Sequence, residues 1–384
     1  MRPLVLLLLA GCDTPDADAD ADADTDTDAG SPCHRPLDDE GGLDPALAAA
    51  LQEVLDTERS RLGAPGATLA VHVPGRGSWV GASGTRDEDQ LEPVRSTDGF
   101  LYGSITKTFV AALVLQLEDE GLLARTDTVD RWYPDLPQAD AITLDLLLQH
   151  GSGLVDYTDL PSFLAAVVGQ DDSGRPVDDV IAEAGARGLR FPPGTAWSYS
   201  NTNYFVLGRV LERLTGEALE DLVRTRLTGP GGLDTIHLSG FDPEPACAPQ
   251  VAGFNYGVPG WSLDPRWQWA SGGLGGDVRD LLRWGRALFD ATLVPPAHLA
   301  LMRDRALFPE EGTTAPAPYG RGMRLEDTPC GFVEGHTGST NGFQSDLFRT
   351  EDGIVVAALH DEFGAEVSDL AYAACVRARE ALAP

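Results

Sequence analysis

Segments with strand character lie near both ends of this chain, and the stretch between them is helical in pattern. Six apolar segments bounded by turn residues are predicted to be strands: 67–73, 78–83, 319–325, 331–336, 342–349 and 353–360. The short connections between neighbouring segments indicate antiparallel pairing, because parallel strands need a long crossover. The sequence therefore predicts an α+β fold in which one antiparallel β-sheet is assembled from the two ends of the chain.

Helices are expected on both sides of this sheet and in the middle of the chain. The run 46–61, preceded by Asp44 and Pro45, is typical of a capped helix, and 367–382 is predicted to be the last helix. Helical patterns with little strand signal fill the region from about 129 to 261, at 143–149, 177–188, 201–215 and 218–227, and another follows at about 276–289. We therefore expect helices flanking the sheet and an all-helical subdomain inserted in the α/β part.

The clearest buried helix begins at Ser104 and ends near Glu120. Its apolar residues recur at helical spacing, at Ile105, Phe109, Val110, Leu113, Val114 and Leu117. Gly121 supplies a stop signal.

The first residues have the layout of an export signal. Arg2 precedes an apolar run from Leu4 to Ala10, and the sequence Leu9-Ala10-Gly11-Cys12 resembles the bacterial lipobox. That resemblance implies a signal peptide at 1–11, a lipid on Cys12 and an exported lipoprotein of the bacterial cell envelope held to the membrane by its lipid anchor. The alternative is a plain signal with an incidental cysteine.

A low-complexity acidic tract follows the signal. Residues 13–30 carry eight aspartates and no large apolar side chain, so they cannot bury enough surface to fold. We expect residues 12–42 to form a disordered linker and residues 43–384 to form the folded domain. The linker is either a stalk that holds the domain away from the membrane or a terminus whose composition has drifted without constraint.

Charge and cysteine content restrict the partners of this domain. With a net charge of −32 the protein would repel a phosphate backbone, so nucleic acid is not expected as a partner. Once Cys12 is lipidated, the remaining cysteines could form two disulfides in any of three pairings: Cys33, Cys247, Cys330 and Cys375. The sequence contains no recognisable metal-binding motif, and we expect neither a metal nor another cofactor.

The first chemically informative pair is Ser104 and Lys107, one turn apart on the buried helix. A serine nucleophile needs a base, and a lysine can serve when desolvation and a helix N-terminus favour its neutral form. Arginine cannot replace it, because arginine does not deprotonate in proteins. Lys107 is the only lysine among 28 basic residues, so lysine is retained where deprotonation would be useful. A surface lysine that happens to follow a serine is the alternative.

Two further motifs each occur once. Tyr199-Ser200-Asn201 precedes a predicted helix, and His336-Thr337-Gly338 ends a predicted strand. Taken alone, Tyr199 could be a core tyrosine and His336 a strand-end histidine. Their occurrence in one chain with Ser104 and Lys107 favours a catalytic interpretation.

The three motifs, in this order, resemble those of the serine penicillin-recognising enzymes, which include class C β-lactamases, DD-carboxypeptidases and related esterases and amidases. Three other stretches are similar to the family: Leu147–Leu154, Phe191–Gly194 and Ser271–Leu274. The resemblance covers about residues 45–383. It implies a β-lactamase/transpeptidase-like fold, which agrees with the pattern of helices and strands.

The resemblance also implies roles for individual residues. Ser104 would attack a carbonyl and become acylated, and Lys107 and Tyr199 would share the base work, with the division between them left open. Asn201 would position the substrate amide and Lys107.

The remaining site residues would hold the substrate. The backbone N–H groups of Ser104 and Ser339 would form the oxyanion hole. His336, Thr337 and Gly338 would contact the substrate, with His336 and Thr337 near its carboxylate or an equivalent group.

The histidine at 336 bears on the substrate. Class C β-lactamases have lysine there, and a neutral imidazole is a weaker anchor for a carboxylate. We therefore expect a serine hydrolase acting on a small-molecule or peptide substrate, resembling a DD-carboxypeptidase or a D-amino-acid-specific peptidase. An esterase, amidase or β-lactamase of the same family, and a non-catalytic envelope lipoprotein that uses the fold for binding, remain alternatives.

Overall fold

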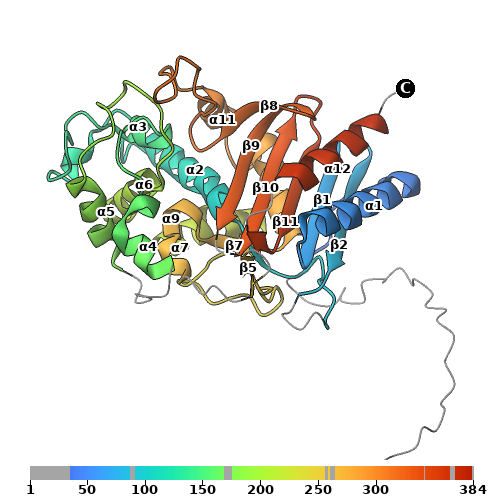
Figure 1. The fold of residues 1–384 in the computed structure, drawn as a ribbon. Coiled ribbons are helices and arrows are strands. Elements are labelled where there is room, and N and C mark those ends of the chain that lie inside the picture. The colour runs from blue at the N-terminus through green and yellow to red at the C-terminus, as the bar shows by residue number, and fades with distance from the viewer. Residues whose placement is uncertain are drawn as a thin grey trace, which may run out of the picture.

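The computed structural model describes residues 35–86, 91–167, 175–255, 258–259, 264–340, 342–363 and 368–382. Its centre is a six-stranded antiparallel sheet in the order β2-β1-β11-β10-β9-β8 (Figure 1). The strands are β1 (Gly66–Val73), β2 (Gly77–Gly84), β8 (Arg324–Thr328), β9 (Gly331–Thr340), β10 (Phe343–Thr350) and β11 (Val355–His360). Because β1 pairs with β11, the two ends of the chain share one sheet, and the predicted architecture is confirmed.

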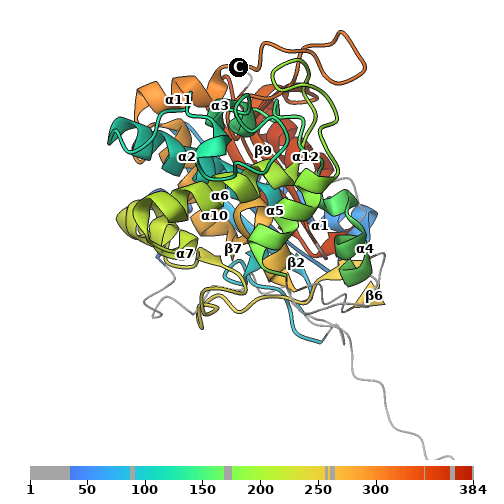
Figure 2. The same ribbon diagram turned by 90° about the vertical axis from the view of Figure 1, so that its left-hand side faces the viewer.

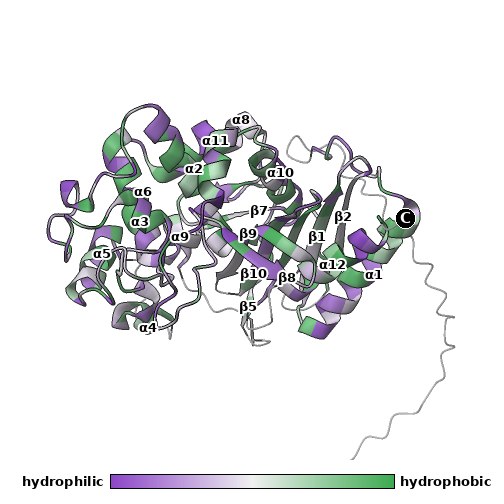
Figure 3. Cartoon of the chain, turned by 90° about the horizontal axis from the view of Figure 1, so that it is seen from above, coloured by the Kyte–Doolittle hydropathy of each residue, from purple (hydrophilic) through white to green (hydrophobic). Residues whose placement is uncertain are grey.

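Helices cover both faces of this sheet. Successive apolar side chains of β11 point to opposite faces, so each face needs a covering layer. Val356 and Ala358 point into a core shared with α1 (Pro45–Leu62) and α12 (Ser368–Glu380). Val355, Ala357 and Leu359 point into the larger core, which includes α2 (Thr106–Asp119) and α10 (Val278–Phe289). Figure 3 shows hydrophobic residues on α2 and α10 where they approach the sheet.

The predicted helical region lies beside the sheet and faces the viewer in Figure 2. Its α-helices are α3 (Leu144–Leu148), α4 (Pro161–Val167), α5 (Val177–Ala186), α6 (Asn201–Thr215), α7 (Leu219–Val223) and α8 (Gly229–Gly231). The short helical turns are η2 (Val129–Arg131), η3 (Tyr157–Asp159) and η4 (Arg224–Thr228), the last with π geometry. Side chains of α6 and α2 share the larger core, so this region is continuous with the rest of the domain.

The sequence missed several short elements. They include the two small sheets made of β3 (Phe100–Leu101), β7 (Leu274–Gly276) and β4 (His237–Leu238), and of β12 (Glu362–Phe363), β5 (Phe254–Asn255) and β6 (Val258–Pro259). The missed helices include α4, η5 (Pro265–Trp267), α9 (Trp269–Gly272) and α11 (Pro296–Arg303), while the predicted helix from Ser104 begins as the short turn η1 (Gly103–Ile105) and continues as α2. Strands of two or three residues are too short to show an alternating pattern, which explains why they escaped detection.

One strand prediction was displaced. Residues 319–325 were expected to be a strand, but the chain bends at 320–322 and β8 begins only at Arg324. Gly322 has a left-handed φ of 71°, and a Cβ there would lie 2.8 Å from the Lys107 carbonyl oxygen. The bend therefore brings the chain directly against α2, where a straight strand and a larger residue would clash.

The N-terminal boundary of the folded part also needs correction. Residues 35–42 were assigned to the linker, but Leu37 is buried in the larger core and Glu40 forms an ion pair with Arg279 at 2.9 Å. Asp39 likewise pairs with Arg286 on α10 at 2.9 Å. Burial of Leu37 and these two ion pairs hold the segment to the domain.

The export signal, Cys12, Cys33 and the acidic tract lie outside the described residues. In the part of the chain that the structure describes, no helix has the length and apolar character needed to span a membrane.

A disulfide joins Cys330, in the turn between β8 and β9, to Cys375 on α12, with the Cα atoms 6.0 Å apart. The bond closes a loop of 45 residues that contains β9, β10 and β11. It thereby ties the edge of the sheet to the helix that covers it.

Replacing both cysteines, as Cys330→Ser with Cys375→Ser, should lower the free energy of unfolding by roughly 2–4 kcal/mol, because the unfolded chain regains the entropy of the open loop. Urea denaturation of the oxidised wild type and the double variant measures the difference. The same loss should follow reduction of the wild type, and an unchanged midpoint in both cases would contradict a stabilising role.

Candidate active site

The candidate site is centred on Lys107, whose side chain is completely buried. Its Nζ atom donates hydrogen bonds to Ser104 Oγ at 2.9 Å, Asn201 Oδ1 at 2.7 Å and the Ser271 carbonyl oxygen at 2.6 Å. These three oxygens use all three hydrogens of an ammonium group. When Nζ is neutral, its lone pair can instead accept the hydrogen of the Ser104 hydroxyl.

Burial changes the protonation of this lysine. Desolvation lowers the pKa of Lys107 from 10.5 to about 7, and the carboxylate of Asp156 opposes that change. A large fraction of Lys107 is therefore neutral near pH 7, as a base for a serine hydroxyl must be.

Two glycines bring strand β9 against the serine. Gly103 in η1 has a φ of 50°, and a Cβ there would lie 2.8 Å from the Ser339 amide nitrogen. A Cβ on Gly338 would clash with the Tyr102 carbonyl oxygen and the Ser345 hydroxyl. This close approach places Ser339, an exposed residue near the end of β9, beside the turn that carries Ser104, where backbone N–H groups can serve as an oxyanion hole.

Tyr199 lies just before α6 and packs against the lysine, with Lys107 Nζ 4.9 Å from the centre of its ring. Burial raises the pKa of the Tyr199 hydroxyl, and the nearby Ser104 hydroxyl only partly offsets this. No described residue makes a hydrogen bond of ordinary geometry with that hydroxyl. Tyr199 is therefore a neutral phenol at neutral pH, close to the serine.

His150, to which the sequence analysis assigned no role, lies directly behind Tyr199. The two rings are 4.2 Å apart, and His150 Nδ1 accepts a hydrogen bond from the Ser200 amide at 3.2 Å. Burial holds the pKa of this imidazole well below its usual range, and the charge of Lys107 lowers it further. His150 thus supports the turn that carries Tyr199.

Asn201 connects the lysine to a half-buried carboxylate, Asp156, that the sequence analysis missed. Asn201 Oδ1 accepts from Lys107, while Asn201 Nδ2 donates to Asp156 Oδ2 at 3.0 Å. Asp156 follows the family-like stretch 147–154 in the sequence, which was the available signal. The Ser271 carbonyl was also missed as a ligand of Lys107, because a backbone oxygen leaves no trace in the residue type.

His336 is buried, and both of its ring nitrogens have partners within the protein. Nε2 lies 2.8 Å from the Tyr319 hydroxyl and Nδ1 lies 2.5 Å from the Thr337 carbonyl oxygen. Because a carbonyl only accepts, Nδ1 carries the hydrogen and Nε2 accepts from Tyr319. Burial keeps the pKa of His336 well below its usual range, so the imidazole is neutral.

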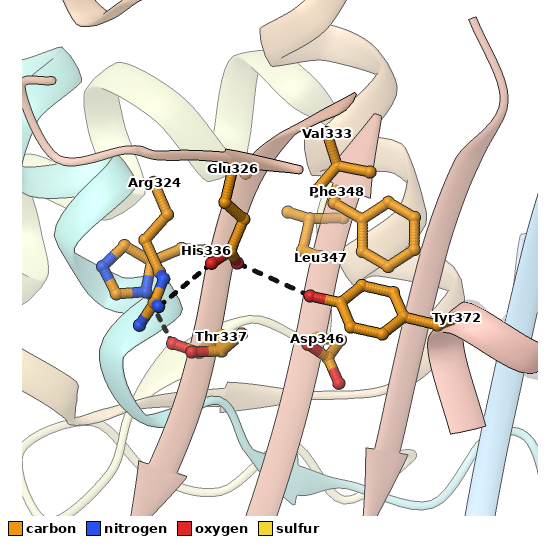
Figure 4. Close-up of a pocket in the computed structure, with 10 residues that line it drawn as sticks. Arg324, Glu326, Val333, His336, Thr337, Asp346, Leu347, Phe348 and Tyr372 are labelled. Carbon is orange, nitrogen blue, oxygen red and sulfur yellow. Dashed lines mark hydrogen bonds and ion pairs between the residues drawn. The ribbon is translucent and has the colours of Figure 1, made fainter. Parts of the chain in front are cut away.

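Thr337 is half-buried and lines a small pocket with Arg324 and Glu326 from β8 (Figure 4). The Arg324 Nη2 atom donates to Glu326 at 3.2 Å. Strand β8 pairs with β9 only from Gly331 to Gly335. On that side, positions 336–340 have no strand partner in the part of the chain that the structure describes. The unpaired segment can accept an extended peptide.

The structure thus brings most predicted residues together. Ser104, Lys107 and Asn201 are in direct contact, Tyr199 packs on Lys107, and the Tyr199 and His336 rings are 6.3 Å apart. Gly338 and Ser339 lie against Gly103. Within the described ranges, no group of three or more His, Cys, Asp or Glu side chains has the arrangement of a metal site.

Comparison with known proteins identifies what the chain resembles. The family model described as Beta-lactamase matches residues 47–377. Penicillin-binding protein 4 of Amycolatopsis lactamdurans is 33% identical over 339 residues, covering 83% of this chain and 86% of the relative. A D-aminopeptidase of Cereibacter sphaeroides is 29% identical over 320 residues, covering 79% of this chain and 58% of the relative.

The fold has a close counterpart among solved structures. The D-stereospecific amidohydrolase from Streptomyces sp. superposes with a TM-score of 0.74 at 29% sequence identity, covering 85% of this chain and 98% of that one.

The single lysine allows its protonation to be observed directly. In protein labelled with ¹³C at the lysine ε-carbon, one resonance is expected from the 384-residue chain. It should titrate near pH 7, whereas the resonance of an exposed lysine titrates above pH 10. Unfolding in urea should restore the ordinary value. A resonance that titrates above pH 10 in the folded protein would contradict the proposed role of Lys107 as a base.

Proposed function

Because this chain belongs to the beta-lactamase family of serine hydrolases, we propose that it hydrolyses an amide bond next to a D-amino acid through an acyl-enzyme on Ser104. The observation that carries the proposal is the 2.9 Å contact between Ser104 Oγ and the buried Lys107 Nζ. A hydroxyl that faces a neutral amine can lose its proton as it attacks a carbonyl.

Acylation would proceed in steps that use the groups already described. Neutral Lys107 takes the proton of Ser104, whose Oγ attacks the amide carbonyl carbon. The negative charge on the carbonyl oxygen is stabilised by the backbone N–H groups of Ser104 and Ser339. The tetrahedral intermediate then expels the amine, which needs a proton, and water later hydrolyses the ester.

The arrangement favours Lys107 as the base and Tyr199 as the proton relay. Lys107 contacts Ser104 directly and is partly neutral near pH 7, whereas burial keeps Tyr199 in its phenol form. A phenol between Lys107 and the leaving nitrogen can donate its own proton and recover one from the ammonium.

The substrate class follows from the relatives and from the shape of the strand edge. The relatives named above are a penicillin-binding protein, a D-aminopeptidase and a D-stereospecific amidohydrolase, which share recognition of D-configured or penicillin-like amides. The unpaired end of β9 suits an extended peptide backbone. The neutral, internally bonded His336 is a poor anchor for the carboxylate of a β-lactam, which argues against a dedicated β-lactamase.

One observation favours the carboxypeptidase form of this activity. Arg324 lies beside Thr337 in the pocket at the end of the free β9 edge, and its charge acts on both His336 and Tyr199. A guanidinium there can receive the C-terminal carboxylate of a peptide. Its ion pair with Glu326 weakens that attraction and must loosen when a carboxylate binds.

We also propose that the enzyme is an exported lipoprotein, on the strength of residues 1–12. Peptides that end in D-amino acids are components of the bacterial envelope, so a lipid anchor at Cys12 would hold the domain near its substrate. Metabolic labelling with a fatty acid should mark the wild type and not a Cys12→Ala variant.

Ser104→Ala should abolish covalent labelling by a fluorophosphonate and by benzylpenicillin without unfolding the domain. Lys107→Arg keeps a positive charge but cannot deprotonate, so labelling should fall at least about 100-fold. Intact-protein mass spectrometry over time measures both. If Ser104→Ala is still labelled, the nucleophile is another residue; if the wild type does not react with either reagent, the chain is a binding protein.

The substrate can be identified with matched peptides. A D-Ala-D-Ala peptide with a free carboxylate should be cleaved faster than its C-terminal amide, and Arg324→Met should reduce that preference about tenfold or more by removing a charged hydrogen bond. A preference for a free D-amino terminus would identify an aminopeptidase. Turnover of short nitrophenyl esters without cleavage of either peptide would identify an esterase.

A further inference from the structure

Asp156 is a half-buried carboxylate that the mechanism above does not use. Its Oδ2 accepts hydrogen bonds from the Asn201 amide nitrogen at 3.1 Å and from Asn201 Nδ2 at 3.0 Å. Its Oδ1 accepts from the Thr158 amide at 3.0 Å and lies 3.3 Å from Asn201 Nδ2. No ion pair joins it to an arginine in the described part of the chain, so its charge is balanced only by hydrogen-bond donors and by Lys107 nearby.

These contacts determine which way the Asn201 amide faces. A carboxylate accepts hydrogen bonds and cannot donate them, so Asn201 must turn its NH₂ group toward Asp156. Its oxygen then faces Lys107, where it receives the Nζ hydrogen at 2.7 Å. If the Asn201 amide were rotated by 180°, its NH₂ group would face the Lys107 ammonium, which is also a donor. Its oxygen would then face the Asp156 carboxylate, and both are acceptors.

We propose that Asp156 is a positioning residue: it holds the Asn201 amide so that Oδ1 faces Lys107, and its charge favours the proton on Lys107 Nζ. The inference rests on the proposed function of Ser104 and Lys107. It adds that a half-buried carboxylate, linked to Lys107 through Asn201, helps the buried lysine to work as a base.

The electrostatic surroundings support this assignment. Burial disfavours the charged form of Lys107, and Asp156 is the group whose charge acts in the opposite direction. The other titratable groups around the lysine are His150 and His336, both neutral, and the phenols of Tyr199 and Tyr204. On its own side, Asp156 faces Lys107 and the phenols of Tyr157 and Tyr199.

The charge matters most when the serine is acylated. Lys107 then receives a proton inside the protein, where an isolated ammonium would be strongly disfavoured. A fixed carboxylate that is already desolvated and held by hydrogen bonds stabilises that ammonium without having to reorganise. Asp156 is thus placed to lower the barrier through Lys107 without touching the substrate.

Asp156 also begins η3 through its contact with the Thr158 amide, so a purely structural role must be distinguished. Asp156→Asn keeps the size and one acceptor oxygen, which can still receive the Thr158 amide hydrogen, but it removes the charge and replaces the oxygen that faces Asn201 with an NH₂ group. Asp159→Asn is the matched control, because it removes a carboxylate from the same short helix at a position whose side chain is 63% exposed.

Two readouts separate positioning from folding. In Asp156→Asn, the ¹³C resonance of the single lysine should titrate about one pH unit lower than in the wild type, since an opposite charge has been removed. Fluorophosphonate labelling requires neutral Lys107, so its rate rises with pH through the pKa of Lys107. In Asp156→Asn, the rise in labelling rate should move to lower pH together with the pKa of Lys107. The maximal labelling rate at high pH should fall about tenfold, because Asn201 loses its fixed orientation. Asp159→Asn should match the wild type in both.

An exchange of the two side chains provides a second test. In the double variant Asp156→Asn with Asn201→Asp, the new amide can donate to the new carboxylate, whose other oxygen can still accept from Lys107. The labelling plateau should recover at least threefold relative to Asp156→Asn, and the lysine should titrate above the wild-type value because the charge is now adjacent.

The proposal is overturned if Asp156→Asn folds and leaves the lysine titration and the labelling profile where they are in the wild type. It is also overturned if the exchanged variant folds and its lysine titrates below that of the wild type. Failure of the proposed function gives a different result: the wild type would not be labelled at all, while the lysine resonance would still report whether Asp156 acts on it.

Discussion

The interaction on which the structure depends is the burial of one amine among oxygens from separate parts of the chain. An ammonium inside a protein is tolerated only when hydrogen bonds replace its water. Lys107 receives them from Ser104 in η1, Asn201 at the start of α6 and Ser271 in α9. These three elements must therefore converge at the N-terminal end of α2, and the helical region and the sheet are held in register around that point.

The same convergence explains why glycine is required on the strand side. Strand β9 approaches the serine segment so closely that Gly103 and Gly338 leave no room for a Cβ. The close approach places the Ser339 amide nitrogen beside the turn that carries Ser104, on a strand edge that has no partner in the described residues. The disulfide between the β8–β9 turn and α12 ties this edge of the sheet to the helix behind it.

Much of the fold and part of the site could be predicted from the sequence, because those features depend on local spacing. Ser104 and Lys107 are three residues apart where η1 runs into α2, and Tyr199 and Asn201 flank a helix start, so their side chains are placed largely by local secondary structure. The alternating strands identified the sheet for the same reason. Tyr319 is a case in which local pattern misleads. Its apolar neighbours in the sequence suggested a strand, but the chain bends at Gly322 and the Tyr319 hydroxyl hydrogen-bonds to His336. Asp156 and the Ser271 carbonyl were missed because their importance depends on contacts between segments distant in the sequence.

The lone lysine has a practical consequence for handling the protein. Because Lys107 is wholly buried and is the only lysine, the surface of the folded domain offers no lysine amine to acylating reagents. A soluble form that begins after the acidic tract would present its α-amino group alone at neutral pH. Amine-directed dyes, biotin or resin would therefore attach at one defined point, the N-terminus, leaving every molecule in the same orientation on a surface.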